Sequence, residues 1–545
     1  MLPPGVAYLA KQVPFLLLPS AFWYTLLNVY LGRGFYVWMC LLLGLSSLPI
    51  LFSALATYER SQIRRNASAR HARLPPVVSA GWGIIGDVNT MVSMLRNFKE
   101  GYPSDYMGEW PKQYGCTFIV QPLFSNMIFT MEPDVIKSLL ATQFGVFEKG
   151  PRFISCMHAV LGTGVFNSDG KFHRALTRPF FARSRISDFD TFDRHAERAI
   201  SLMRSHLSSK GSVDFQDIIS RFTLDSASSF LFGIELGTLC PSDNYADQFF
   251  TRFNPVDFAA SFSRAQMIVA LREVTGPSWP LAEFWKDQVK SEMDVVNKFI
   301  SFVVEEALCR AKVNRESSRD KDSFGEVNEG DTLLDHLVRH TDDPVVIKDE
   351  IINILVAGKD TTASTLTFVV YMLTEHPYVL ERLREEILSI IGPSRRPTMD
   401  DFKNMKYLRA IINETLRLYP TVPFNVRILY SVFMMHRRKD LWGPDALDFD
   451  PDRFIDERLQ KYLVPNPFIF LPFNAGPRIC LGQQFAYNEI SFFLVRLLQA
   501  FSTISLGEVT ILAPSHWSVN AEGRQKEEKV RLQLHLTLYI EVCPY

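Results

Sequence analysis

The sequence predicts a mainly α-helical protein with minor β-sheet, preceded by a membrane anchor. Three patterns predict this class. Apolar residues recur with helical spacing over most of the chain, short apolar bursts between residues 115 and 130 are typical of a small sheet, and two long uncharged runs lie within the first 58 residues. Hydrophobic residues make up 47% of the 545 and charged residues 21%, which excludes a mainly disordered chain.

Charge and cysteine content exclude further classes. The chain has 58 basic and 59 acidic side chains, a net charge of −1, which argues against a general nucleic-acid-binding protein. Its seven cysteines are scattered and form no C-x-x-C pair, so neither a disulfide framework nor a zinc site is indicated. At about 100–200 residues per domain the length permits three domains, and the pattern alone leaves their number open.

The N-terminal segment is the expected anchor. Residues 35–55 are 21 positions without a charge, enough for a membrane helix, and residues 13–31 form a second uncharged run that contains two prolines. Five arginines (Arg60, Arg64, Arg65, Arg70 and Arg73) follow, which predicts that the rest of the chain faces the cytosol. The pair Pro75-Pro76 is expected to break the helix. The alternative is a buried hairpin of core helices.

Other elements are predicted from local patterns. A polar stretch at residues 313–331 indicates a surface loop, and strict alternation over residues 531–542 predicts a strand. Helical spacing predicts three helices, at residues 347–375, 378–391 and 407–419, the last ended by a proline.

One stretch carries chemistry, residues 473–482 (FNAGPRICLG), directly ahead of a helical pattern at 485–501. Cys480 lies close to the expected helix N-terminus, where the dipole and backbone N–H groups favour a thiolate, which is a soft metal ligand. Gly476 and Gly482 allow the backbone to pass close to a flat cofactor, and Phe473 can shield the sulfur from water. Arg478 can pair with an anionic substituent. The alternative is a plain loop cysteine in a glycine turn.

This stretch resembles the cysteine-ligand loop of the cytochrome P-450 superfamily, the haem-thiolate monooxygenases. Residues 357–362 (AGKDTT) resemble the family's oxygen-activating groove, which interrupts a long helix. Here a Thr hydroxyl can bond back to a carbonyl one turn earlier. The resemblance implies that Asp360 and Thr361 pass protons to bound oxygen. The alternative is a solvent-facing polar patch on the helix.

The resemblance also implies a buried structural triad. Glu414 and Arg417 are three residues apart and so share one helix face. In the family a later arginine, matched here by Arg453, joins such a pair to fix the cysteine loop. The resemblance runs from about residue 75 to the end, which predicts an anchor and hinge over residues 1–75 and one catalytic domain over residues 76–545.

The resemblance implies a haem b enzyme with Cys480 as the axial ligand of the iron. Such an enzyme inserts one oxygen atom of O₂ into an apolar substrate, using NADPH electrons from a flavoprotein reductase. The motifs are most similar to fungal membrane-bound hydroxylases of alkanes and fatty acids, so such a substrate, or a xenobiotic, is expected. Expected partners are membrane lipid and the reductase, with no nucleic acid, at the endoplasmic reticulum membrane. Four basic residues offer a docking patch for the reductase, namely Lys171, Arg174, Arg178 and Arg183.

Two departures from the family pattern keep a second function open. Gly170 stands where the family has a tryptophan, although Arg174 can still bind a haem propionate. Residues 422–435 run without a turn signal, so two strands are expected to be fused and Arg427, a candidate propionate ligand, displaced. Both places look like short internal deletions. The alternative is therefore an impaired or inactive haem-binding paralogue.

Overall fold

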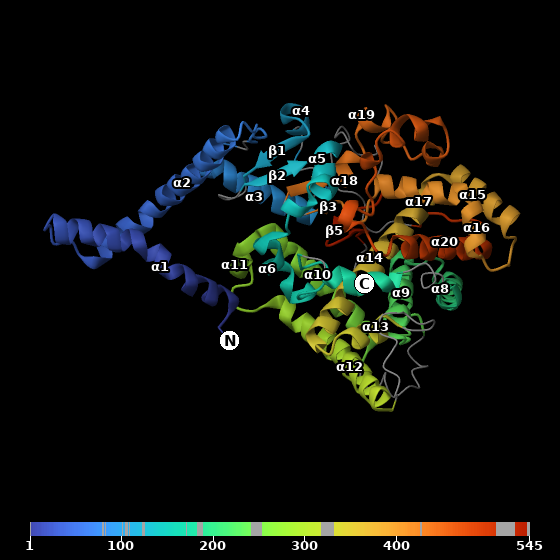
Figure 1. Ribbon diagram of the computed structural model, residues 1–545. Helices are drawn as coiled ribbons and strands as arrows, with labels where there is room; N and C mark the ends of the chain where they lie inside the picture. Colours follow the sequence, from blue (N-terminus) through green and yellow to red (C-terminus); the bar gives the residue numbers. More distant parts are fainter. Residues whose placement is uncertain are drawn as a thin grey trace. The chain divides into compact units, whose positions relative to one another are not determined.

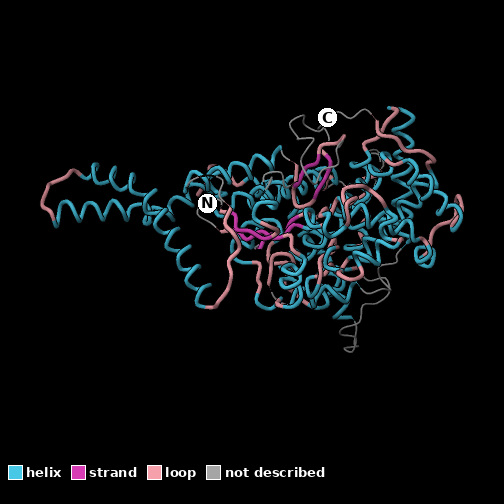
Figure 2. Tube along the Cα trace, turned by 90° about the horizontal axis from the view of Figure 1, so that it is seen from above, coloured by secondary structure: helices cyan, strands magenta, loops and turns pink. Residues whose placement is uncertain are grey.

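The structure is a computed structural model and describes most of the chain. The described residues are 2–78, 81, 83–100, 102–103, 107, 110–121, 126–169, 172–181, 189–240, 253–317, 332–425, 428–507 and 529–541. They fall into two compact units, which we describe separately. The first comprises residues 1–130, 272–288 and 427–429, and the second comprises the remainder. Helix dominates the trace and the strands are few and short, as predicted (Figure 2).

The first unit begins with a helical hairpin. Helix α1 (Pro4–Tyr24), continued by the π-helical η1 (Thr25–Tyr30), packs against α2 (Val37–Ala69) (Figure 1). Gly44 permits this contact, because a Cβ there would lie 1.9 Å from the Ser20 hydroxyl oxygen. The Asn28 side chain closes the turn, accepting from the N–H of Phe35 and donating to its carbonyl.

Both helices of the hairpin are long and apolar enough to cross a membrane. The most apolar 18-residue stretch of each has a mean hydropathy of 1.3 and 2.1, respectively, and only 11% of that stretch is buried. The alternative of a buried core hairpin is therefore wrong. The expectation that Pro75-Pro76 breaks the second helix is also wrong. Helix α2 ends at Ala69, and the left-handed backbone of His71 (φ +52°) turns the chain away before the prolines are reached.

The rest of the first unit contains a two-stranded pair. Strands β1 (Thr117–Val120) and β2 (Met127–Thr130) are antiparallel with Thr117 opposite Thr130, which confirms the small sheet predicted near residues 115–130. The other elements of the unit are α3 (Gly83–Glu100), α4 (Trp110–Tyr114), η7 (Gly276–Ser278) and α11 (Trp279–Ala282).

The second unit is a bundle of helices around a large apolar core. Its α-helices, wholly or mainly in this unit, are α5 (Pro133–Lys137), α6 (Gly150–Leu161), α7 (Phe172–Thr177), α8 (Phe189–Lys210), α9 (Phe215–Phe232), α10 (Pro255–Thr275), α12 (Gln288–Ser317), α13 (Leu333–His340), α14 (Pro344–Glu375), α15 (Pro377–Ile390), α16 (Met399–Asn404), α17 (Lys406–Leu418), α18 (Val432–Met435), α19 (Lys439–Trp442) and α20 (Gln483–Ala500). Shorter 3₁₀ and π segments are η3 (Ser138–Thr142), η4 (Phe144–Val146), η5 (Arg178–Phe181), η8 (Pro451–Phe454), η9 (Leu459–Leu463), η10 (Pro467–Ile469) and η11 (Gly476–Arg478).

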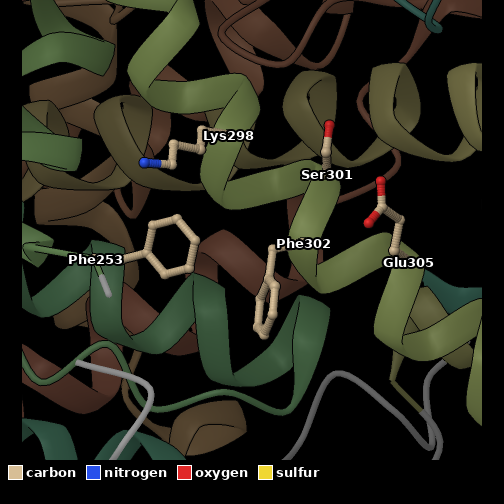
Figure 3. Close-up of a pocket in the computed structure, with 5 residues that line it drawn as sticks. All are labelled: Phe253, Lys298, Ser301, Phe302 and Glu305. Atoms are coloured by element: carbon tan, nitrogen blue, oxygen red, sulfur yellow. The ribbon is translucent and has the colours of Figure 1, made fainter. Parts of the chain in front are cut away.

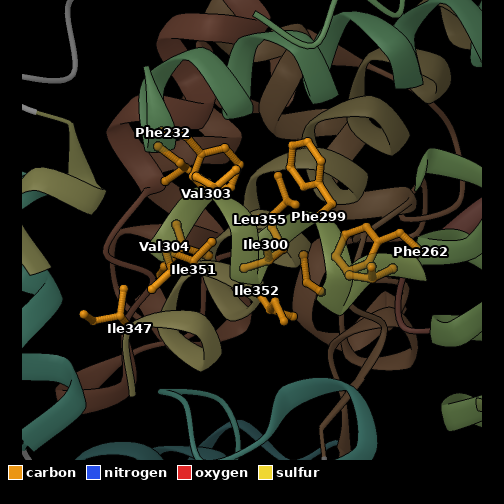
Figure 4. Packing of buried hydrophobic residues seen from close by; sticks show 14 of the residues in the cluster. Phe232, Phe262, Phe299, Ile300, Val303, Val304, Ile347, Ile351, Ile352 and Leu355 are labelled. Carbon is orange, nitrogen blue, oxygen red and sulfur yellow. The ribbon is translucent and has the colours of Figure 1, made fainter. Parts of the chain in front are cut away.

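Helix α14 runs through this bundle, among α9, α10, α13 and α20 (Figure 1). Asp343 caps its start by accepting from the Val345 N–H at 2.9 Å, with Pro344 at the first helical position. Figure 4 shows its aliphatic residues, Ile351 and Leu355 among them, packed against aromatic rings such as Phe299. Burial of this face holds α14 in place, as expected for a helix apolar on most sides.

The helices predicted at 347–375, 378–391 and 407–419 are confirmed, with boundaries that differ by at most three residues. The strand predicted over 531–542 is wrong. The chain forms a hairpin instead, in which β5 (Leu532–Leu534) pairs antiparallel with β6 (Leu538–Ile540). Alternation does not distinguish one long strand from two short ones, because the side-chain period of two is the same in both.

The fused strand expected at 422–435 is also wrong. Strands β3 (Phe424–Asn425) and β4 (Ile428–Ser431) pair antiparallel, with Asn425 opposite Tyr430, so the chain reverses between them. The Ser431 hydroxyl then caps α18 by accepting from the Met434 N–H at 3.1 Å. A helical turn, rather than more strand, ends the segment.

Candidate active site

The loop from Phe473 to Gly482 lies just before α20 and is closed by its own backbone. The Cys480 N–H donates to the Phe473 carbonyl at 2.9 Å. Gly476 has a left-handed backbone (φ +60°), and a Cβ there would lie 2.1 Å from the Leu140 carbonyl oxygen. Gly476 therefore permits a close backbone approach, and the partner is the η3 segment. Gly482 meets only ordinary contact, 3.6 Å from Phe181.

Cys480 is exposed on one side and closely surrounded by protein on the other. This burial raises the pKa of the thiol, although the Gly482 N–H and the Arg174 guanidinium lower it in part. The backbone N–H and the cation thus act in the expected direction on the thiol. Desolvation of the charged form outweighs the backbone and the cation.

Two arginines flank the cysteine. Arg174, on α7, donates from Nη2 to the Ile479 carbonyl at 2.6 Å, beside Cys480. Arg478 donates to the Phe147 carbonyl and to the Asp169 carboxylate, both at 3.2 Å. Guanidinium groups pair well with carboxylates, so both arginines are suited to bind an anionic group beside Cys480.

The aromatic ring of Phe473 packs on Tyr487 at a centroid distance of 5.0 Å. This contact positions the ring at the base of the loop. An exposed thiol with two guanidinium groups beside it is a donor set that fits an iron porphyrin with carboxylate side arms.

Several candidate residues lie outside the described part of the chain. They are Gly170, Lys171, Arg183 and Arg427. Of the expected reductase patch, Arg178 is exposed on η5 and Arg174 is turned toward the cysteine loop.

Helix α14 carries the second predicted motif, and its expected interruption is wrong because the α-helix continues from Pro344 to Glu375. The back-bonding hydroxyl is confirmed, since Thr361 Oγ1 donates to the Ala357 carbonyl at 2.6 Å. Such a bond does not by itself break a helix when the surrounding faces are packed. The polar patch is also not solvent-facing, because Lys359 and Thr362 are buried.

Asp360 is held on both oxygens. Lys359 Nζ donates to Oδ1 at 2.7 Å, and Gln266 Nε2, from α10, donates to Oδ2 at 2.8 Å. Burial alone raises the pKa of the Asp360 carboxyl, but Lys359, His535 and Gln266 together lower it below its usual value. Asp360 is therefore an ionised acceptor.

Sequence reasoning missed these partners of Asp360. Gln266 and His535 lie far away in the chain, so no local spacing identifies them. Lys359 directly precedes Asp360 in an apolar stretch of the sequence. This neighbouring pair of opposite charges was the signal that could have identified Lys359 as a partner of Asp360.

Glu414, Arg417 and Arg453 are brought together, fully buried. Arg417 forms a two-point contact with Glu414 at 2.7 and 2.8 Å, and Arg453 Nε lies 3.4 Å from the same carboxylate. The second guanidinium is compensated by Asp445, whose carboxylate accepts from Arg453 Nη2 at 3.0 Å. A buried cluster of this kind is stable only when its donors are satisfied.

His436 connects this cluster to the cysteine loop and was not foreseen. Its ring lies between the Arg417 carbonyl and the Leu471 N–H, just ahead of Phe473. The ring and its partners are close only in the fold, so only the tertiary structure identifies the link.

The described residues also line a cavity of about 440 Å³ in the second unit (Figure 3). Four of its lining residues lie on α12, namely Lys298, Ser301, Phe302 and Glu305, and the fifth is Phe253. It includes none of the candidate site residues.

Comparison with known proteins agrees with this geometry. The family model for cytochrome P450 matches residues 89–526. The chain belongs to the cytochrome P450 family, the haem-thiolate monooxygenases, which confirms the resemblance.

Its relatives include fungal proteins. Cytochrome P450 52E1 of Candida apicola is 35% identical over 415 residues, 70% of this chain and 76% of the relative. Cytochrome P450 52-E3 of Starmerella bombicola is 32% identical over 503 residues, 86% of this chain and 92% of the relative. Cytochrome P450 monooxygenase himC of Aspergillus japonicus is 34% identical over 434 residues, 74% of this chain and 73% of the relative.

Proposed function

We propose that this chain hydroxylates a long-chain alkane or fatty acid, or a xenobiotic, with NADPH electrons supplied through a flavoprotein reductase. The observation that carries the proposal is the exposed Cys480 thiol on a loop closed by the Phe473 carbonyl, with Arg174 and Arg478 beside it. The similarity to Cytochrome P450 52E1 and Cytochrome P450 52-E3 supports the monooxygenase part of the proposal.

Cys480 holds the iron of haem b in this proposal, and the bound haem supplies the activation of O₂. Arg174 and Arg478 pair with the carboxylate side arms, together with Arg427. Cys480 would bind the iron as a thiolate, so its thiol would have to lose the proton that burial favours. Phe473 shields the sulfur from water.

Thr361 and Asp360 handle protons. The Thr361 hydroxyl already donates to the Ala357 carbonyl, so it can exchange that partner for a bound ligand. Asp360, held by Lys359 and Gln266, is ionised at rest, so it can accept a proton and then pass it on. The cluster of Glu414, Arg417 and Arg453 keeps the loop in place through His436.

The helical hairpin formed by α1 and α2 anchors the enzyme in the endoplasmic reticulum membrane, with residues 76–545 as the cytosolic catalytic domain. Both helices present long apolar surfaces that are exposed in the chain by itself, including Leu18 and Phe22 on α1 and Leu42 on α2. An apolar substrate dissolved in the bilayer then lies close to the enzyme.

The carbon monoxide difference spectrum of the reduced protein tests the proposal. We expect a long-wavelength thiolate-type band that Cys480→Ala abolishes. Cys309→Ala, at another exposed cysteine, is the matched control and retains the band. A protein that binds no haem overturns the proposal, whereas a protein that shows the band but forms no product is the inactive haem-binding paralogue suggested by the departures at Gly170 and Arg427. Product analysis with alkanes and fatty acids, reductase and NADPH then identifies the substrate.

A further inference from the structure

The hairpin formed by α1 and α2 carries its charges at two levels. One uncharged run of 21 residues lies between Lys11 and Arg33, and a second of 25 residues lies between Arg33 and Glu59. At 1.5 Å per helical residue the first run spans about 31 Å, close to the hydrocarbon thickness of a bilayer. Lys11 and Glu59 therefore lie at a similar level at the base of the hairpin, one membrane thickness from Arg33 at its turn.

The two helices stay paired over this length. Toward the base, the rings of Phe15 and Phe52 lie 5.8 Å apart between their centroids, and nearer the turn the buried Ser20 lies against Gly44. Small residues at a helix contact are typical of packing in lipid. Four hydroxyls donate to carbonyls of their own helix, those of Thr25, Ser46, Ser47 and Ser53. A bond of this kind satisfies a hydroxyl where no water is present.

The N-terminal end of α1 is held by a loop that lies far away in the sequence. The Gly5 N–H donates to the Phe284 carbonyl at 2.9 Å, and α1 contacts α11 just ahead of that residue (Figure 1). A Cβ at Gly5 would lie 2.2 Å from the Phe284 ring, so glycine is required for this close approach. The contact therefore fixes the base of α1 against residues 279–284.

A buried ion pair fixes the loop that receives Gly5. Arg272, only 3% exposed, donates to both oxygens of Glu283 at 2.7 and 2.6 Å and to Asp287 at 2.6 Å. Its guanidinium also lies over the Trp279 ring, 3.6 Å from the centroid. A two-point contact combined with stacking on a ring holds a guanidinium in one orientation. Phe284 is thus part of a well-defined surface.

The loop is on the same side of the membrane as the catalytic domain. It connects α10 to α12, and among the residues that the structure describes only α1 and α2 are long and apolar enough to cross a bilayer. If either α1 or α2 crossed alone, Gly5 and Phe284 would lie on opposite sides. Their hydrogen bond requires both helices to cross.

The distribution of basic residues leads to the same orientation independently. Near the base of the hairpin are Lys11 and the five arginines that follow α2, whereas the turn has Arg33 alone. Basic residues gather in the segments that stay on the cytosolic side. Both ends of the hairpin therefore carry the signal of the cytosolic side.

We propose that the chain crosses the membrane twice, with the N-terminal end of α1 on the side of the catalytic domain and the turn at residues 31–36 on the opposite side. This arrangement rests on the membrane anchor of the proposed function. The surface of the hairpin is covered by the whole thickness of a lipid bilayer. Two connections join the anchor to the rest of the chain, the segment after α2 and the contact of Gly5 with Phe284.

Cysteine labelling of the full chain in sealed microsomes tests the arrangement. Leu2→Cys and Tyr36→Cys place a thiol at each end of α1, at positions that are 66% and 71% exposed. A maleimide that does not cross membranes is applied before and after permeabilisation, and the label added beyond that of the wild type is measured. We expect Leu2→Cys to be labelled equally in both conditions and Tyr36→Cys only after permeabilisation. Cys309, exposed on α12, is the internal control for the catalytic side.

Glycosylation gives a second readout that needs no added cysteine. A segment with an Asn-x-Thr acceptor is inserted between Gly32 and Arg33, and in a matched chain it is placed ahead of Met1. We expect a glycan on the first chain only, because the modifying enzyme acts on the side opposite to the cytosol. This readout replaces labelling where a cysteine variant does not accumulate.

Each alternative gives its own result. Protection of Leu2→Cys in sealed microsomes, or a glycan on the segment ahead of Met1, overturns the proposal in favour of a single crossing. Labelling of Tyr36→Cys before permeabilisation, or in neither condition, also overturns it, because the turn then does not reach the opposite side. Release of the wild type from microsomes by alkaline carbonate overturns the membrane anchor itself. The carbon monoxide spectrum tests the haem chemistry separately.

Discussion

His436 Nε2 accepts a hydrogen bond from the Leu471 N–H at 3.0 Å. The other ring nitrogen, Nδ1, lies 3.2 Å from the Arg417 carbonyl, so the ring is neutral and carries its proton on Nδ1. Burial, with Arg417 and Arg437 nearby, lowers the pKa of His436 to about 3. One imidazole thus ties α17 to the backbone that leads into the cysteine loop.

Protonation of His436 should destabilise the fold. Its pKa is about 3 when folded and about 6.5 when unfolded, so the unfolded chain binds more protons between these values. The stability it contributes is complete above pH 6.5 and is lost as the pH falls toward 3. At pH 7, His436→Gln should cost about 1–3 kcal/mol and should flatten the pH dependence below pH 6.5. Guanidinium unfolding at several pH values measures both.

The matched control for that experiment is His206→Gln, at a half-buried histidine on α8. It should leave the unfolding free energy and its pH dependence near those of the wild type. A His436→Gln variant that keeps the wild-type slope contradicts the assignment.

Removing the shared carboxylate of the buried cluster should be strongly destabilising. Glu414→Gln leaves Arg417 without a carboxylate and Arg453 with Asp445 alone, at a cost of about 3–5 kcal/mol. The exposed pair Lys290 and Asp294 is the control, because surface i,i+4 pairs contribute only about 0.3–0.5 kcal/mol. Thermal and chemical unfolding compare Glu414→Gln with Asp294→Asn. Equal losses in the two variants would rule out a structural role for the cluster.

Gly476→Ala should disrupt the cysteine loop. The added Cβ meets the Leu140 carbonyl oxygen at 2.1 Å, in a backbone conformation with φ +60°. Gly211→Ala is the matched control, since its φ is +74° and nothing lies within 4 Å of the added atom. We expect Gly211→Ala to show only the backbone cost, about 1 kcal/mol, and Gly476→Ala to lose more stability and to release haem faster. Similar haem retention in both variants contradicts the steric argument.

Lys359→Met should leave Asp360 buried without its cation. We expect a loss of about 3–5 kcal/mol and a higher pKa for the Asp360 carboxyl, because the largest favourable interaction with its charged form is removed. Lys348→Met, on the same helix, is the control. Its amine lies 3.9 Å from Asp349 and is partly exposed, so the loss should stay below about 1 kcal/mol. Unfolding free energies at pH 7 distinguish the two. Equal losses would mean that the Lys359 pair contributes no more than a surface pair.

Local patterns predicted the long helices well. The helix at 347–375 was found because its apolar residues continue for many turns, and its start shifted only to Pro344, where Asp343 caps it. The hairpin formed by β5 and β6 was missed for a physical reason. Residues 531–542 alternate equally well as one strand or two, and the decision falls to the turn in which the His535 N–H donates to the Thr537 carbonyl at 3.1 Å.

The sequence by itself pointed to the residues that are proposed to carry the chemistry. Cys480, Asp360, Thr361 and the Glu414–Arg417 pair lie in patterns whose spacing is local, so a single helix or loop suffices to recognise them. The tertiary structure decided how these groups are held. Gln266 and His436 contact neighbours distant in the chain, Asp360 in the first case and the Leu471 N–H in the second. Desolvation and hydrogen bonding depend on everything packed around a group, and no spacing along the chain records them.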